Sequence, residues 1–401
     1  MVTPIPPPCD DSRIASLDGL RGIAAVIVML GHFVLAFTPV WYAGTVAFNW
    51  SGPNIAAKTP LFVLQSGTFA VFVFFALSGF VMAQSGDRSR APLLALAGTR
   101  LLRLNIPVAA SIALAVVLLA IFPNEIHDVA AIVRHGWVQG WYQPGGPSLL
   151  EVAIGLARGS YRAAIYYNPV VWTMRVELIG SLVIYTIYKA VPARYVVPCL
   201  VAGLVFTFFR TGTQGFLFGF FSGALLYTYW SRGHVPRSSV AWVVFLIGTY
   251  LGGFPFAEPR GPSYQWLADL LRPIADPELA TRNAGAILVL IAMLYLPGVR
   301  AVFSMSIPGF LGRISFALYL THFPILCTMV AATWLWIGPD HQFLLFLAFV
   351  ALTVSVAWVM TVVIDEPMIR RLSRIRRWSQ SWRGPVAFGA RPAATQPSKS
   401  G

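Results

Sequence analysis

The sequence predicts an all-α fold: a polytopic membrane helix bundle of about ten transmembrane helices, with the N- and C-termini in the cytoplasm. Three observations predict this fold. Of the 401 residues, 57% are hydrophobic and only 11% are charged, whereas soluble domains usually carry about 25% charged residues. Apolar runs of about 20 residues, the length that crosses a bilayer, recur from end to end. Arginine and lysine residues gather in alternate segments between those runs.

Ten apolar segments are the expected membrane spans, taken in chain order. Several contain proline or glycine, which membrane helices tolerate because neighbouring groups satisfy the freed backbone. The segments are 15–37, 61–84, 104–122, 169–190, 195–210, 214–230, 239–256, 284–299, 315–337 and 342–364.

The positive charges orient these spans. If the N-terminus is cytoplasmic, the segments on that side hold 20 of the 29 Lys and Arg residues, the outer segments hold eight, and Arg175 lies within a span. Cytoplasmic loops carry such an excess of basic residues. An even number of spans with both ends inside therefore fits the charges.

Three regions are expected: a disordered cytoplasmic N-terminus at 1–13, a membrane domain at 14–366, and a basic cytoplasmic helix with a disordered tail at 367–401. The chain begins with prolines and acidic residues rather than a basic signal-peptide start, so the first helix is expected to be retained. Two long outer segments, 123–168 and 257–283, contain aromatic residues and turn formers that suit the walls of a polar-substrate site. Trp and Tyr also favour the membrane interface itself.

The composition argues against several other classes of protein. The net charge of +14 does not indicate nucleic-acid binding, because the basic residues mark the ends of apolar runs rather than a soluble aromatic module. Three scattered cysteines (Cys9, Cys199 and Cys327) form neither a disulfide framework nor a metal motif. The six histidines lack zinc-site spacing, so no metal is expected.

Ionisable residues inside the spans are the candidate functional residues. Inserting a charged side chain at the bilayer centre costs about 2.5–3.5 kcal/mol of free energy. Each such residue is therefore expected to have a partner, a water-filled cavity or a function. In the first span Arg21 and His32 are eleven residues apart, which places them on one helix face, roughly 16 Å apart along the axis. Asp18 lies one turn before Arg21 and can pair with it. A histidine there can act as a general base. The alternative is that Arg21 snorkels and His32 is a packing residue.

Arg100 and Arg103 precede the third span and share a helix face, so two guanidinium groups can grip one polyphosphate. The alternative is ordinary cytoplasmic positive charge. In the fourth span Arg175 and Glu177 point different ways. Glu177 is expected to face the bundle interior, either for catalysis or in a structural ion pair between helices.

Two further positions are weaker candidates. His322 precedes Pro324 in the ninth span, where a single histidine is a packing residue or a catalytic one. Ser78 lies in the second span within "FFALSGF", where small residues let helices pack closely. A nucleophilic role for Ser78 lacks a base that the sequence identifies.

Taken together, these segments resemble the acyltransferase 3 family of integral membrane acyltransferases. "LDGLRGIAAVIVMLGHF" is similar to the opening of the family, with its Arg-ten residues-His motif at Arg21 and His32. "FFALSGF", the Arg-x-x-Arg at Arg100 and Arg103, and "VWTMRVE" ending in Glu177 resemble the next landmarks. "GRISFALYLTHFP" and "DEPMIRRLSR" resemble the last ones. The resemblance runs from about residue 14 to 374.

The resemblance implies a ten-helix core and transfer of an acyl group, commonly acetyl, from cytoplasmic acyl-CoA to a hydroxyl outside. Acceptors in the family are usually surface or secreted glycans, and sometimes lipids or antibiotics. A bacterial cytoplasmic (inner) membrane is the expected location. Some members carry an added SGNH-type esterase domain; this chain is expected to be a stand-alone member.

The implied donor site lies at the cytoplasmic mouth. Arg100 and Arg103 would hold the CoA phosphates. Arg21, paired with Asp18, would contact the pantetheine or position the thioester. Extended pantetheine has the length needed to reach from Arg21 to His32.

The implied catalytic groups are His32, Glu177 and Arg21. His32 would accept the proton of the attacking hydroxyl, and Glu177 would orient the imidazole as in a catalytic triad. Direct attack and an acyl-histidine intermediate both stay open. Further candidate residues are Asp18, Ser78, Trp172, Arg175 and His322.

A second function class also fits the buried polar residues. A multi-pass transporter or flippase would use Arg, His and Glu side chains as a polar pathway. A membrane O-acyltransferase of the other large fold class is disfavoured, since its key histidine lies in later helices. The sequence does not define the acceptor, the acyl chain length or the oligomeric state.

Overall fold

The computed structural model is helical throughout the part of the chain that it describes. That part comprises residues 15–39, 42, 59–133, 140–142, 145–158, 164–208, 210, 212–233, 238–255, 261–274 and 276–381. The predicted N-terminal region at 1–13 and residues 382–401 of the predicted C-terminal region at 367–401 lie outside these residues. Within them, seven helical segments are long and apolar enough to cross a membrane. The protein is therefore a multi-pass helical membrane protein.

Each of the ten predicted spans falls on a helix. Seven of them correspond to the long segments Ala15–Phe37, Gly67–Arg88, Leu93–Ile121, Pro169–Ala190, Pro277–Tyr295, Ser306–Ile337 and Pro339–Ser379. The other three fall on α10 (Ala193–Phe208), α11 (Gly212–Trp230) and α12 (Ser238–Gly252). A total of ten membrane crossings remains a prediction.

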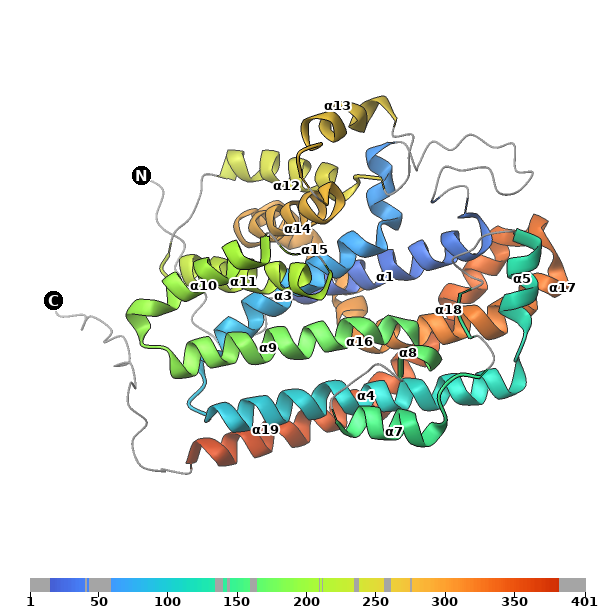
Figure 1. Ribbon diagram of the computed structural model, residues 1–401, viewed down its shortest axis with the longest axis horizontal. Helices are drawn as coiled ribbons and strands as arrows, with labels where there is room; N and C mark the ends of the chain where they lie inside the picture. Colours follow the sequence, from blue (N-terminus) through green and yellow to red (C-terminus); the bar gives the residue numbers. More distant parts are fainter. Residues whose placement is uncertain are drawn as a thin grey trace.

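The most enclosed helices form the centre of the bundle, and the long helices around them face outward (Figure 1). In an apolar 18-residue stretch of Ser306–Ile337, 89% of the residues are buried, whereas the corresponding shares in Leu93–Ile121 and Pro339–Ser379 are 39% and 28%. The central helices are α1 (Ala15–Phe37), α3 (Gly67–Arg88), α9 (Trp172–Ala190) and α16 (Ser306–Ile325); α4 (Leu93–Ile121) and α18 (Gln342–Met360) flank them. On the other side of α3 pack α11 and α14 (Pro277–Tyr295).

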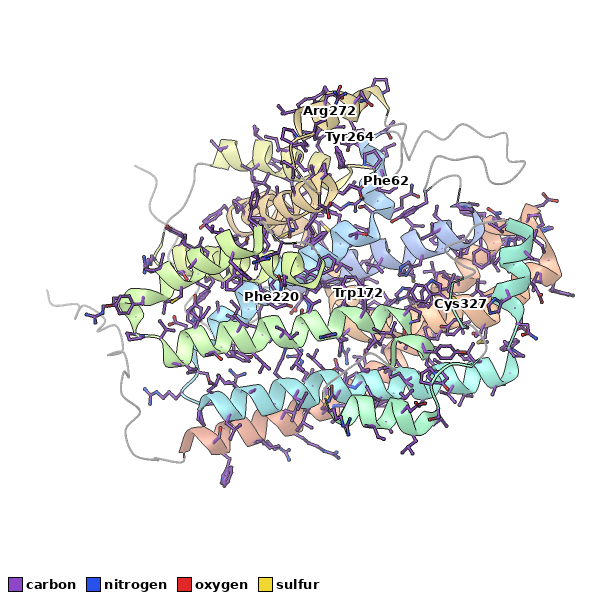
Figure 2. The ribbon with its side chains drawn as sticks, viewed as in Figure 1. Phe62, Trp172, Phe220, Tyr264, Arg272 and Cys327 are labelled. Atoms are coloured by element: carbon purple, nitrogen blue, oxygen red, sulfur yellow. The ribbon has the colours of Figure 1, made fainter. Side chains whose placement is uncertain are left out.

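Glycines bring α3 and α11 into backbone contact. A Cβ at Gly79 would overlap the carbonyl oxygen of Phe220, and a Cβ at Gly223 would overlap that of Ala76. The ring of Phe220 in turn fills the space beside Gly180 of α9 (Figure 2). Helices in lipid depend on such close van der Waals packing, because they gain little from burying apolar surface.

Glycines also bring α1 and α16 into backbone contact. A Cβ at Gly22 would overlap backbone atoms of Leu311 and Gly312, and a Cβ at Gly312 would overlap the carbonyl group of Asp18. The N-terminal halves of these two helices therefore run side by side and in the same direction. This contact fixes the register of α1 against α16, and so which residues further along the two helices lie next to each other.

The last predicted span and the basic segment after it form one continuous helical rod. A π-helical turn, η6 (Thr361–Asp365), joins α18 to α19 (Glu366–Ser381) without a break. Helix α19 lies along α4 (Figure 1), and Arg313 Nε of α16 donates to Glu366 Oε1 at 2.6 Å. The predicted border at 366/367 thus falls inside a helix rather than in a linker.

The predicted outer segments contain short helices where the structure describes them. These helices are α5 (Glu125–Val133), α7 (Leu149–Ala157), α8 (Ala164–Tyr167) and α13 (Pro262–Leu270). Helix α7 begins with a capping box in which Ser148 and Glu151 exchange side-chain and backbone hydrogen bonds. Figure 1 shows α5 at the opposite end of the bundle from the C-terminal end of α9 and the start of α10.

The contact of α3 with α11 yields the first testable prediction. Gly223→Ala should destabilise the protein by about 1–3 kcal/mol, the usual cost of overpacking, because the new methyl group meets backbone that cannot rotate away. The melting temperature of the detergent-solubilised protein measures this loss.

The matched control is Gly98→Ala on α4, where nothing lies within 4 Å of the added Cβ. This change should be neutral or stabilising by up to about 1 kcal/mol, since alanine favours a helix over glycine. Equal melting temperatures for the two variants would contradict the proposed backbone contact.

Candidate active site

Ionisable residues of the bundle line two neighbouring cavities. The first, here the cationic cavity, spans about 590 Å³ including the part open to solvent. Arg21, Arg100 and Arg103 contribute to its wall. The second, here the histidine cavity, spans about 1090 Å³ on the same measure and contains His32 and Trp172 in its wall. Trp172 lies near the middle of the bundle (Figure 2).

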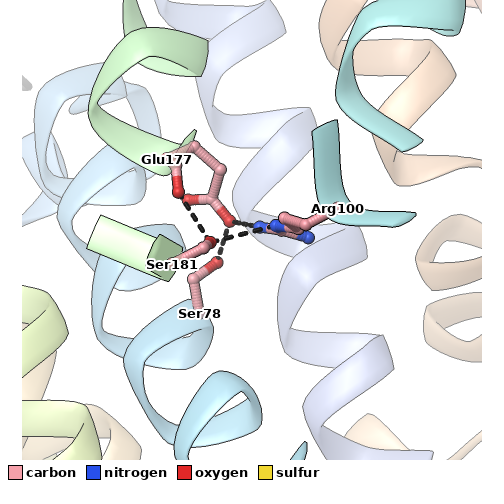
Figure 3. A network of polar contacts seen from close by, with 4 residues as sticks. All are labelled: Ser78, Arg100, Glu177 and Ser181. Carbon is pink, nitrogen blue, oxygen red and sulfur yellow. Dashed lines mark hydrogen bonds and ion pairs between the residues drawn. The ribbon is translucent and has the colours of Figure 1, made fainter. Parts of the chain in front are cut away.

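Three helices contribute to an ion-pair network beside the cationic cavity (Figure 3). The guanidinium group of Arg100 donates to Glu177 Oε1 through Nη2 and to Ser181 Oγ through Nε, the latter at 3.0 Å. Ser78 Oγ donates to the same carboxylate oxygen at 2.5 Å. Arg100 and Glu177 are only 9% and 8% exposed, so each neutralises a charge that would be costly to bury alone.

Helix geometry explains why Glu177 rather than Arg175 joins this network. The two residues are separated by about 200° around α9, so one points into the bundle and the other outward. Glu177 is buried and Arg175 is exposed. Ser181, one turn after Glu177, donates its hydroxyl to the Glu177 carbonyl at 2.6 Å and accepts from Arg100.

The remaining two arginines of the cationic cavity are half-buried. Arg21 Nη1 lies 3.8 Å from Asp18 Oδ1, which is the pairing that their spacing predicts. Arg103 lies three residues after Arg100 on α4 and lines the same cavity. The structure therefore brings Arg21, Arg100 and Arg103 to one cavity, in which Arg100 is bound to the carboxylate of Glu177, another wall residue.

Two histidines from different helices meet at the histidine cavity. His32 Nδ1 lies 2.8 Å from His322 Nε2, and the two ring planes are within 11° of each other, with centroids 5.1 Å apart. His322 Nδ1 lies 3.1 Å from the carbonyl oxygen of Leu318. His322 is fully buried and His32 is partly exposed.

The register of α1 and α16 explains this meeting. Each histidine lies ten residues after a glycine of the close contact, Gly22 in α1 and Gly312 in α16. Because the two helices run in the same direction there, residues that follow the contact by the same number of positions lie at the same height along the helix axes. The glycine contact thus sets the geometry of the histidine pair.

The hydrogen bonds define the tautomers when both rings are neutral. A carbonyl oxygen only accepts, so His322 Nδ1 must carry a proton and Nε2 a lone pair. His32 Nδ1 must then donate to His322, which leaves the lone pair of His32 on Nε2. That is the form an imidazole needs to accept a proton from a substrate.

The expected contact between Glu177 and His32 is not what the structure shows. Glu177 lines the cationic cavity and accepts from Arg100 and Ser78, whereas His322 is the polar side chain placed against His32 Nδ1. The physical reason is charge: the carboxylate is matched by a buried guanidinium, and the imidazole by a neutral ring. Ser78, for which the sequence indicated no neighbouring base, lies beside that carboxylate.

Sequence reasoning missed two residues that border both cavities. Tyr319 lines the cationic and the histidine cavities, as does Val71 of α3. The Tyr319 hydroxyl lies 3.0 Å from Thr173 Oγ1 and 3.2 Å from the carbonyl oxygen of Val170. Its position three residues before His322, on the same helix face, was the available signal.

The described residues hold no group of three or more His, Cys, Asp and Glu side chains placed to bind a metal ion. Cys327 is buried, and Cys199 is partly buried. The side chains that line the two cavities and can take part in chemistry include three arginines, His32, the Glu177 carboxylate and several hydroxyl groups.

Comparisons with known proteins identify the family of the chain. The acyltransferase domain model of the acyltransferase 3 family matches residues 14–362. "Acyltransferase R4" of Phoma sp. is 25% identical, over 83% of this chain and 86% of its own. "Exopolysaccharide production protein ExoZ" of Rhizobium meliloti is 26% identical, over 80% and 95%. "O-acetyltransferase PaAT-1" of Phomopsis amygdali is 24% identical, over 87% and 80%. No solved structure matches the chain.

A multi-pass helical bundle, matched over most of its length by this domain, defines a membrane-bound acyltransferase. The chain belongs to the acyltransferase 3 family. The family resemblance inferred from the motifs is confirmed.

The buried ion pair generates a prediction about stability. Arg100→Leu leaves the Glu177 carboxylate buried without its guanidinium and should cost about 3–5 kcal/mol. Removing both charges, with Arg100→Leu and Glu177→Leu together, should restore part of that loss. Thermal melting in detergent compares the single and double variants.

The control is Arg272→Leu, which removes an exposed ion pair with Asp269. Such surface pairs contribute little, so the melting temperature should barely change. A double variant as unstable as the sum of the two single variants would show that Arg100 and Glu177 do not depend on each other.

Proposed function

We propose that this acyltransferase moves an acetyl group from cytoplasmic acyl-CoA to a hydroxyl of an extracytoplasmic glycan or a related surface or secreted acceptor. The proposed location is a bacterial cytoplasmic membrane, with the basic end of the bundle, including α19, on the cytoplasmic side. The excess of Arg and Lys in the segments assigned to that side supports this orientation.

The histidine pair is the single observation that carries the proposal. The carbonyl group of Leu318, His322 and His32 form a chain of hydrogen bonds that leaves a lone pair on His32 Nε2. An imidazole in this form is a competent general base near neutral pH. Since His32 lines the larger cavity, its base is accessible to an acceptor hydroxyl.

The reaction then follows as acyl transfer with balanced bonds and protons. The acceptor oxygen forms a bond to the thioester carbonyl carbon while His32 Nε2 takes the hydroxyl proton. The carbon–sulfur bond breaks, and the proton passes from His32 to the leaving CoA thiolate. His322 Nε2 accepts from His32 Nδ1 throughout and stabilises the imidazolium, the role that an aspartate has in a catalytic triad.

The cationic cavity suits the donor. Arg21 and Arg103 present guanidinium groups that match phosphate oxygens, and Arg100 adds positive potential although its carboxylate partner holds it in place. Arg21 and His32 are roughly 16 Å apart along α1, a distance that an extended pantetheine arm bridges. The thioester would thus reach the histidine pair from the cavity that holds the nucleotide.

The histidine cavity suits a polar acceptor with apolar faces. Trp141, Trp172 and Tyr42 line it together with the hydroxyl-bearing Thr68. Aromatic rings stack on the C–H faces of sugar rings, and hydroxyl groups hydrogen-bond to their edges. The name of the relative ExoZ refers to exopolysaccharide production and that of PaAT-1 to O-acetyl transfer, which also favours a glycan hydroxyl.

Replacing the histidines tests the mechanism. His32→Ala should lower transfer by about 10²–10⁴-fold, the usual contribution of a general base. His322→Leu should lower it by roughly tenfold or more, while His322→Gln, whose amide oxygen can accept from His32 Nδ1, should regain part of it. The measurement is labelled acetyl groups on endogenous acceptors of inverted membrane vesicles, with mass analysis of surface glycans in cells.

The control for this series is His341→Ala. His341 is exposed and ends the 3-10 helix η5 (Pro339–His341), which follows α17 (Ala331–Ile337). The transfer rate of this variant should match that of the unaltered protein. Full activity in His32→Ala, at equal protein level in the membrane, would remove His32 from the mechanism.

A second prediction concerns the donor. Arg103→Ala should raise the KM for acetyl-CoA by about 10–100-fold, the value of one charge-assisted hydrogen bond. Arg194→Ala, which removes an exposed arginine at the start of α10, should leave the KM unchanged. If both variants raise the KM by the same factor, Arg103 contributes only general positive charge and no specific contact with the donor.

A further inference from the structure

The two cavities share two wall residues, Val71 of α3 and Tyr319 of α16. Each of the other described residues that line them belongs to one cavity alone. A donor that enters through the cationic cavity and reacts at His32 would cross the boundary between the cavities, where these two side chains lie. Both are buried, at 6% and 5% exposed.

The tyrosine ring is held rigidly at this junction. Its hydroxyl lies within hydrogen-bond distance of Thr173 Oγ1, at 3.0 Å, and of the Val170 carbonyl oxygen, at 3.2 Å. Its ring packs edge-on against Phe74, with centroids 5.8 Å apart. A ring anchored at its far end and along its side cannot swing away without breaking these contacts, so the passage has a fixed width.

We propose that Val71 and Tyr319 form an aperture that selects the acyl group by its width. This inference rests on the proposed function. The acyl end of the donor enters the aperture first, because the thioester carbonyl must emerge beside His32 while the nucleotide stays with the arginines. Narrow, unbranched acyl groups such as acetyl and butyryl pass, whereas acyl groups branched or ringed next to the carbonyl are held back.

The physical basis is packing against a rigid wall. An added methyl group in a closely packed site changes discrimination by about 10–200-fold, because neither a β-branched valine nor an anchored ring yields to it. Length is a weaker criterion here, since a linear chain that has passed the aperture enters the larger of the two cavities. The structure thus assigns the choice of acyl donor to this pair.

The experiment compares labelled acetyl-, butyryl-, isobutyryl- and benzoyl-CoA as donors in inverted membrane vesicles, with transfer to endogenous acceptors as the readout. Val71→Ala widens the aperture and should raise the isobutyryl-to-acetyl ratio of kcat/KM by about tenfold or more. Val71→Thr has nearly the same shape and should keep the original ratio. Because the readout is a ratio, it does not depend on the amount of folded protein.

Two further variants distinguish an aperture from a general enlargement of the cavity and from a chemical role of the tyrosine. Leu35→Ala enlarges the histidine cavity at a residue that the cationic cavity does not share, and its ratio should stay that of the unaltered protein. Tyr319→Phe removes the hydroxyl anchors but keeps the ring, so it should raise the ratio while acetyl transfer continues. Loss of acetyl transfer in folded Tyr319→Phe would instead place the hydroxyl in the chemistry and overturn an aperture-only role.

The outcomes distinguish the two proposals. If the unaltered protein labels acceptors from none of the donors above the level of His32→Ala, the proposed function fails. If acetyl transfer occurs but Val71→Ala keeps the original ratio, or Leu35→Ala raises it equally, the aperture fails while the function stands.

Discussion

The contact between the backbones of α1 and α16 is the constraint on which the rest of the site depends. Gly22 and Gly312 leave no side chain between the two helices, and in lipid such closeness supplies much of the attraction between helices. The contact also fixes how far one helix is displaced along the other. His32 and His322 meet because they follow these glycines by the same number of residues.

The second constraint is the cost of charge within the membrane. Arg100 and Glu177 are nearly as buried as the apolar core, and they occur as a pair with two serine hydroxyls completing their hydrogen bonds. Removing water from such groups is expensive unless the partners compensate for it. The buried Arg100–Glu177 pair thus lies in the wall of the cationic cavity and His32 in the wall of the histidine cavity, with Tyr319 in the wall of both.

Much of the fold follows from the sequence because the bilayer restricts the options. Apolar length and basic loop residues were enough to place all ten predicted helices, since only a helix satisfies its own backbone in lipid. Helix periodicity also separated Glu177 from Arg175 correctly. Helix periodicity describes one helix at a time. It therefore predicted the interaction of Arg21 with Asp18, which lie in the same helix.

Contacts between helices were less accessible to sequence reasoning. The partner of His32 is 290 residues away, and it depends on a register that two glycines set through backbone contact. Nothing in the local pattern distinguishes those glycines from the other glycines of the chain. Tyr319 was missed for a related reason: its significance comes from the two cavities that it adjoins, which exist only after packing.

The continuous rod of α18, η6 and α19 links the depth of the protein in the bilayer to the position of the cationic cavity. Helix α19 exposes several arginines and Trp378, groups that settle among lipid headgroups, and it lies against α4, which carries Arg100 and Arg103. With no hinge loop in between, a thinner or thicker membrane tilts the rod as a whole. The depth at which α19 settles in the membrane is accordingly linked to the depth of Arg100 and Arg103 on α4.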